Sequence, residues 1–141
     1  MFLLDTNVVS ELRKAHSRKV DENFARWSNA LSVDEAFLSA ITVMELEMGV
    51  LAMERRDPTS GVALRAWMDQ QVMPSFAGRI LPVDEEIARC CARLHIPDRK
   101  SERDALIAAT AIVRGMTVVT RNVRDFRPTG AAVLNPWDTS R

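Results

Sequence analysis

The chain lacks a net charge and lacks any apolar run long enough to cross a membrane. Its 19 lysines and arginines balance 19 aspartates and glutamates. The chain is therefore not the uniformly basic body that attracts nucleic acid over long distances. A membrane-spanning helix needs about 18 or more consecutive apolar residues, and the charge at Asp5 argues against a signal-peptide core directly after the start. We expect a cytoplasmic protein with no membrane contact.

Cysteine and histidine are scarce, which removes several kinds of site. Cys90 and Cys91 are adjacent in the sequence. Ordinary disulfide geometry is not accessible to such a pair, and neither residue has a spaced partner for a metal site, so we expect two buried thiols. His16 and His95 fall in or beside expected loops, and no motif pairs them with a nucleophile or a carboxylate. No Ser-His-Asp or Cys-His arrangement is visible.

The composition is that of one globular domain, which we expect to span residues 1–141. Hydrophobic residues make up 47% of the chain and charged residues 27%, with no low-complexity tract. Short apolar segments alternate with helix-like segments along the whole length. This alternation favours a three-layer α/β/α fold, in which helices flank a mainly parallel sheet of four to five short strands.

Apolar runs and capping residues predict where the elements lie. The expected strands are residues 2–4, 36–41, 79–83, 117–120 and 131–134. The expected helices are residues 6–13, 20–31, 42–55, 57–72, 84–94 and 101–115. Capping-box sequences predict that Glu45 and Asp104 each lie in the first turn of a helix, three residues after Thr42 and Ser101.

Four acids stand at strand ends or helix starts. Asp5 follows the first strand, Glu45 and Asp104 open helices, and Asp125 comes after the strand that ends at Thr120. In a parallel α/β sheet these places converge on the carboxyl edge, where ligands bind. Each acid also has a structural interpretation, because carboxylates often cap helices or form turns.

Carboxylates gathered at one edge predict a metal centre. They repel one another, which raises their pKa values and destabilises the fold unless a cation neutralises them. Hard oxygen ligands select Mg²⁺ or Mn²⁺, and such an ion can activate a water for attack on a phosphodiester. Residues 99–127 carry seven basic side chains against three acids. Most basic residues of the chain are arginines, which codon bias alone could produce. We nevertheless expect Arg121 and Arg124 to position backbone phosphates.

Five segments together resemble one known family. Residues 1–11, 38–49, 104–111, 120–126 and 133–137 are similar, in this order, to the motifs of PIN-domain ribonucleases. The resemblance is to the toxins of VapBC-type toxin–antitoxin pairs, in the FitB-like branch. It implies a PIN-like fold and a Mg²⁺-dependent endoribonuclease in which Mn²⁺ can replace Mg²⁺. It further implies a homodimer, and a cognate antitoxin whose C-terminal segment wraps the toxin and enters the acidic site.

The resemblance also implies roles for individual residues. Asp5, Glu45, Asp104 and Asp125 take the catalytic positions, with Asp5 and Asp104 as the direct Mg²⁺ ligands. Some relatives carry aspartate at the position of Asn122, so either Asp125 completes the site or Asn122 holds a water. We assign substrate binding to the polar residues beside these acids: Thr6, Asn7, Thr120, Arg121 and Asn122.

Two other functions stay open at this point. A phosphatase of the haloacid dehalogenase type also places an aspartate after its first strand, but it needs a second aspartate two residues later, where this chain has Asn7. The chain could also be a binding module that keeps the fold without the chemistry. Uptake of Mg²⁺ or Mn²⁺ separates that module from the nuclease.

Overall fold

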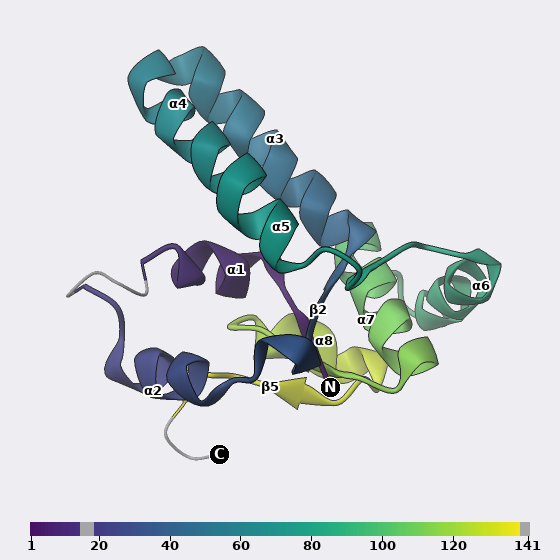
Figure 1. The fold of residues 1–141 in the computed structure, drawn as a ribbon. Coiled ribbons are helices and arrows are strands. Elements are labelled where there is room, and N and C mark those ends of the chain that lie inside the picture. The colour runs from purple at the N-terminus through teal and green to yellow at the C-terminus, as the bar shows by residue number, and fades with distance from the viewer. Residues whose placement is uncertain (15–18, 139–141) are drawn as a thin grey trace.

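One parallel sheet forms the centre of the molecule. The computed structural model describes residues 1–14 and 19–138, and Figure 1 shows the sheet among its helices. The strand order is β3-β2-β1-β4-β5, and every pairing is parallel. The strands are β1 (Phe2–Leu4), β2 (Ala36–Ser39), β3 (Ile80–Leu81), β4 (Thr117–Val119) and β5 (Val133–Leu134). The predicted α/β fold with a parallel sheet is confirmed.

Helices flank this sheet and follow the predicted order closely. They are α1 (Thr6–Leu12), α2 (Glu22–Ala30), α3 (Ala40–Arg56), α4 (Pro58–Trp67), α5 (Met73–Ser75), α6 (Glu85–Leu94), α7 (Glu102–Arg114) and α8 (Val123–Phe126). Short 3-10 turns cover Val33–Glu35 and Arg127–Thr129. No helix in the described part of the chain is long and apolar enough to span a bilayer.

The central strand β1 explains why the core has two sides. Its neighbours are β2 and β4, and both Leu3 and Leu4 are fully buried. Successive side chains of a strand point to opposite faces. Leu4 accordingly packs in a cluster with Val8 and Phe24 from α1 and α2, while Leu3 packs with Ile107 from α7. The all-apolar first strand therefore holds together the two helix layers.

Helices α3 and α4 form a long antiparallel pair that extends away from the sheet (Figure 1). The turn is the predicted one, because Asp57 caps α4 with its side chain and Pro58 is the first helical residue. The predicted helix over 57–72 does not end at Val72. It passes through a π-helical turn at Met68–Val72 and continues as α5.

The start of α3 differs from the prediction. The strand ends at Ser39 and the helix begins at Ala40, with Ser39 Oγ accepting a 3.0 Å hydrogen bond from the amide of Ile41. Thr42 lies inside the helix, and its buried hydroxyl has no hydrogen-bond partner among the described residues. The capping-box interpretation of Glu45 is therefore wrong, and this carboxylate lies beyond the first turn.

Helix α7 corrects a second capping prediction. Ser101 is its N-cap residue, but the serine side chain makes no capping hydrogen bond, so Asp104 does not belong to a capping box. The other end is as predicted. Gly115 ends the helix with φ of 68°, in the left-handed region that glycine enters without strain.

The two cysteines and His95 have structural rather than site positions. Cys90 and Cys91 are buried free thiols, as predicted. His95 follows α6, and its Nδ1 accepts a 3.1 Å hydrogen bond from the amide of Lys100. His16 lies outside the described residues.

Candidate active site

Asp5 is a buried carboxylate held from several directions. It directly follows β1, and its amide donates to the carbonyl of Val119 on the neighbouring strand. Its Oδ1 accepts from the amide of Thr6 at 2.8 Å, as a helix cap does. Its Oδ2 accepts from Thr120 Oγ1 at 2.7 Å and from Asn7 Nδ2 at 3.2 Å. Asp5 therefore caps α1 and also has a fixed orientation at the carboxyl edge of the sheet.

Thr120 and Asn7 join the loops that leave β4 and β1. Thr120 is fully buried, and its Oγ1 also accepts a 2.9 Å hydrogen bond from the amide of Asn122. Asn7 Oδ1 accepts a 3.2 Å hydrogen bond from the amide of Arg121. In this structure Thr120 and Asn7 thus hold Asp5 in place, and substrate binding by these residues stays a prediction.

Glu45 reaches the same edge from α3. Its Oε1 accepts a 2.6 Å hydrogen bond from Thr6 Oγ1, and its Oε2 lies 3.6 Å from Arg103 Nη1. Arg103 was not among the residues predicted for the site. The sequence signal available for it is its place beside Asp104 in the first turn of α7.

The four predicted acids interact through their negative charges. The pKa of Asp104 rises from 3.8 to about 6, because the carboxyl is partly buried and because the charges of Asp5, Asp125 and Glu45 act on it. Burial is also the main reason why the pKa of Asp5 is raised, and Glu45 adds to it, whereas the hydrogen bonds from Thr120 and Thr6 oppose the rise. Asp5 after β1, Glu45 on α3, Asp104 on α7 and Asp125 on α8 thus interact through their charges, and we call these four residues the acidic cluster.

A small cavity of about 210 Å³ adjoins this cluster. Asp104 and Asp125 line it together with Lys100 and Arg124. Lys100 has a fixed position, since its Nζ donates to the carbonyl of Leu94 at 2.7 Å. The cavity therefore places two positive groups beside two of the acids. Asn122 is not among the residues that line it, and whether Asp125 or Asn122 completes the site stays a prediction.

The donors of the cluster suit a hard divalent cation. All are carboxylate oxygens, and the raised pKa values of Asp5 and Asp104 mean that a nearby positive charge would relieve their repulsion. As the side chains lie, no group of three or more histidine, cysteine or acidic residues in the described ranges is close enough to enclose a metal ion. Mg²⁺ needs only one or two direct carboxylates, because it keeps several of its waters.

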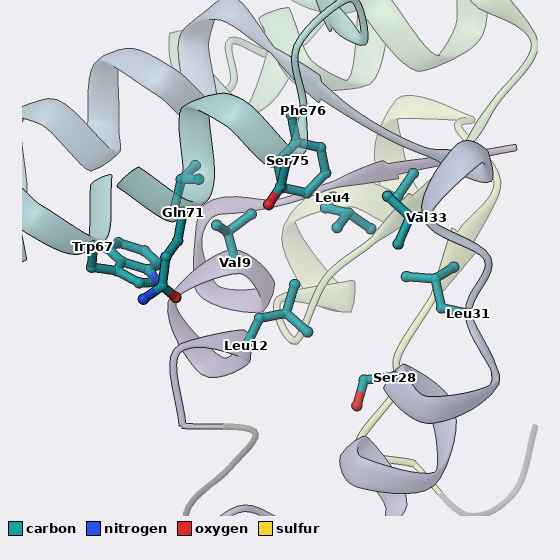
Figure 2. A pocket seen from close by; sticks show the side chains of 12 residues that line it. Leu4, Val9, Leu12, Ser28, Leu31, Val33, Trp67, Gln71, Ser75 and Phe76 are labelled. Carbon is teal, nitrogen blue, oxygen red and sulfur yellow. The ribbon is translucent and has the colours of Figure 1, made fainter. Parts of the chain in front are cut away.

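An apolar cavity of about 450 Å³, lined in part by Leu4 of β1, was not predicted (Figure 2). Figure 2 shows its walls coming from α1, from the segment after α2, and from the α4–α5 helix. The apolar lining includes Leu4, Val9, Leu12, Leu31, Trp67 and Phe76. Because Asp5 directly follows Leu4, this cavity and the acidic cluster adjoin the same short stretch of chain.

Sequence comparison finds close relatives over nearly the full length. The family model described as the PIN domain matches residues 2–131. The chain is 37% identical to the VapC ribonuclease Y4jK of Sinorhizobium fredii, over 98% of this chain and 99% of the relative. It is also 37% identical to the toxin FitB of Neisseria gonorrhoeae, over 97% of this chain and 99% of that toxin.

Solved structures show the same arrangement. A chain of FitAB bound to an IR36 DNA fragment superposes with a TM-score of 0.88 at 36% identity, covering all of this chain and 99% of the other. A chain of FitAcB from Neisseria gonorrhoeae gives a TM-score of 0.86 at 37% identity, covering 97% of this chain and 99% of the other. The likeness therefore extends to the complete fold described above.

Proposed function

This chain belongs to the PIN domain family, and we propose that it is the toxin of a VapBC-type pair, a Mg²⁺-dependent endoribonuclease acting in the cytoplasm. The observation that carries the proposal is the placement of the acids: Asp104 and Asp125 line one cavity, and the charges of Asp5 and Glu45 also act on Asp104. A cluster of this kind is costly to the fold on its own. A divalent cation bound at this carboxyl edge of the sheet would offset the repulsion and could act on a phosphodiester there.

The chain's own residues supply binding and orientation. Asp5 and Asp104 would hold the ion, and Mn²⁺ is expected to substitute for Mg²⁺. When bound, the ion lowers the pKa of a water and stabilises charge on the leaving oxygen. Thr120 fixes the Asp5 carboxylate, and Thr6 fixes Glu45, so neither acid must be reordered when substrate arrives.

Positive groups near the acids would receive the RNA backbone. Lys100 and Arg124 line the cavity beside Asp104 and Asp125. Their charges offset the repulsion between a phosphodiester and the carboxylates. Contacts to phosphates carry no sequence information by themselves, so the choice of RNA depends on the shape of the surrounding loops.

The natural partner is proposed to be a cognate antitoxin. Two similar solved structures are those of FitAB bound to an IR36 DNA fragment and of FitAcB from Neisseria gonorrhoeae. The apolar cavity in Figure 2 suits an apolar segment of that antitoxin, since it opens beside Leu4 and the chain leads directly to Asp5. We further propose a homodimer, because Met44, Met48 and Leu51 form an exposed apolar stripe on α3.

The alternatives receive less support from the site. The position where a phosphatase needs its second aspartate holds Asn7, whose amide nitrogen donates to Asp5 and is not an acid. A binding module without chemistry would not need four interacting carboxylates at one edge.

The test is RNA cleavage by the purified protein after the antitoxin has been removed. Cleavage that requires Mg²⁺ or Mn²⁺ and stops in EDTA is the expected result. Calorimetry should detect uptake of either ion, and Asp104→Ala should reduce it. Intact RNA in the presence of both ions would reject the catalytic proposal, and absence of metal uptake would favour the binding module.

A further inference from the structure

The contacts around the C-terminal segment point to an additional part of the RNA-binding surface. We propose that Trp137 is a positioning residue that holds the guanidinium of Arg121 for a backbone phosphate next to the cleaved bond. The inference rests on the proposed ribonuclease function and extends it to a residue outside the acidic cluster.

Trp137 has a fixed place against α2. Its ring centroid lies 4.8 Å from that of Phe24, which is itself fully buried. Its carbonyl accepts a 3.1 Å hydrogen bond from Asn23 Nδ2, and its amide donates a 2.9 Å hydrogen bond to Asn135 Oδ1. Figure 1 shows the chain after β5 running toward α2. Side chain and backbone together therefore fix the orientation of the indole.

The guanidinium of Arg121 lies over this indole. Its Cζ is 5.0 Å from the ring centroid, within the range of a cation–π interaction. The backbone of Arg121 is tied to the acidic cluster, since its amide donates to Asn7 Oδ1 and Asn7 in turn donates to Asp5. Arg121 thus connects the edge that carries Asp5 with the Trp137 platform.

The charge of Arg121 has no acidic partner in the part of the chain that the structure describes. Among the described residues no carboxylate forms an ion pair with it, whereas Arg103 faces Glu45 and Arg114 pairs with Asp84. The contact with the indole takes up none of the guanidinium N–H groups in a hydrogen bond to oxygen, so these groups remain for oxygen acceptors. Such a fork binds phosphate oxygens in a bidentate manner.

The pre-positioning by Trp137 matters for affinity. A free arginine side chain loses rotamer freedom when it binds a phosphate, and a side chain already ordered on a ring loses less. Removing the ring should therefore weaken RNA binding through Arg121, even though Trp137 itself need not touch the RNA. The two side chains should behave as one unit.

The experiment measures binding of a fluorescein-labelled single-stranded RNA in EDTA, by anisotropy at several salt concentrations. Arg121→Gln and Trp137→Leu should each weaken binding about three- to tenfold and reduce the salt slope by roughly one phosphate contact. The double variant should be no weaker than Arg121→Gln alone, because neighbours that act together are not additive. Trp137→Phe keeps a ring and should retain most of the affinity.

One control carries a matched charge change elsewhere on the surface. Arg89→Gln removes one positive charge from the exposed side of α6. This variant should bind RNA as the wild type does. Melting temperatures show which variants are folded, and if Trp137→Leu fails to fold, Trp137→Phe and Arg121→Gln decide the matter.

Several outcomes would overturn the inference. These are wild-type affinity and salt slope in a folded Trp137→Leu, losses that add in the double variant, or unchanged binding by Arg121→Gln. Cleavage by the wild type with Mg²⁺ is measured in parallel. If the wild type cuts RNA but neither substitution changes RNA binding, only this inference is wrong. If RNA binding depends on Trp137 and Arg121 but no RNA is cut, only the catalytic proposal is contradicted.

Discussion

Thr120 donates a 2.7 Å hydrogen bond to Asp5, across 115 residues of sequence. The two residues follow β4 and β1, which are paired in the sheet, and both side chains are buried. The hydroxyl lowers the pKa of a carboxyl that burial would otherwise raise further. The strand pairing therefore places a hydroxyl that orients the central acid and lowers its pKa.

Replacement of Thr120 by valine tests this relationship. Thr120→Val keeps the shape of the side chain but removes the donor, so the pKa of Asp5 should rise and its carboxylate should lose orientation. We expect metal affinity and cleavage rate to fall about tenfold, as when an outer partner of a metal ligand is removed. Calorimetry with Mn²⁺ and an RNA cleavage assay provide the measurement.

Thr110→Val is the matched control for this change. Thr110 is equally buried, but its hydroxyl donates to the carbonyl of Leu106 within α7. It should lose some stability and keep its metal affinity. Equal metal affinities in both variants would remove the orienting role assigned to Thr120.

Asp5→Asn separates catalysis from folding and partner binding. An amide retains an oxygen that can accept from Thr6 and removes a charge whose burial is unfavourable. The variant should therefore stay folded and still form a complex with its antitoxin, while RNA cleavage is lost. Cleavage, circular dichroism and co-purification measure the three properties, and near-normal cleavage by Asp5→Asn would contradict the assignment of Asp5 as a metal ligand.

The pKa of Asp104 predicts how the metal-free protein responds to pH. Its value of about 6 in the folded state lies above the ordinary 3.8, so the folded protein binds this proton more tightly than the unfolded chain. The resulting penalty is fully present above pH 6 and disappears as the pH falls below the ordinary value. Asp104→Asn should stabilise the protein in EDTA at pH 7.5 by about 1 kcal/mol, the full shift being reduced because the group is partly exposed.

Thermal unfolding in EDTA between pH 7.5 and pH 4 measures this effect. The advantage of Asp104→Asn should stay constant from pH 7.5 to about pH 6 and shrink between pH 6 and pH 4. The exposed Asp34→Asn serves as a control for removing one negative charge. An advantage of the same size at both ends would show that the acidic cluster does not cause it.

Local sequence patterns were enough for most elements, but not for every boundary. The apolar run of β1 and the glycine that ends α7 each predict one structure, and both were found. Ala40 and Ile41 are different, because apolar residues fit a buried strand and a buried helix equally well. The Ser39 side chain decides between them by capping α3, and this was not visible from periodicity.

The acidic cluster was predictable because parallel strands carry their carboxyl ends to one edge, whichever residues lie between them. The contacts that organise the cluster were not predictable in the same way. The pairs Thr120–Asp5 and Arg103–Glu45 join elements far apart in the sequence, and Arg121–Trp137 joins the segments on either side of β5. Such pairs depend on strand order and helix packing, and no local spacing encodes them.

Gly61 tests how closely α3 and α4 must pack. A Cβ atom at this residue would lie 2.5 Å from Glu54 Cα, which is backbone and cannot rotate away. The helices of Gly61→Ala must therefore move apart, and we expect a loss of about 2 kcal/mol in the free energy of unfolding. Gly49→Ala is the matched control, because a Cβ there meets nothing within 4 Å and alanine is the better helix former. Urea denaturation should show destabilisation by the first change and a small gain from the second, and equal stability of the two variants would mean that the close approach of α3 and α4 does not require glycine.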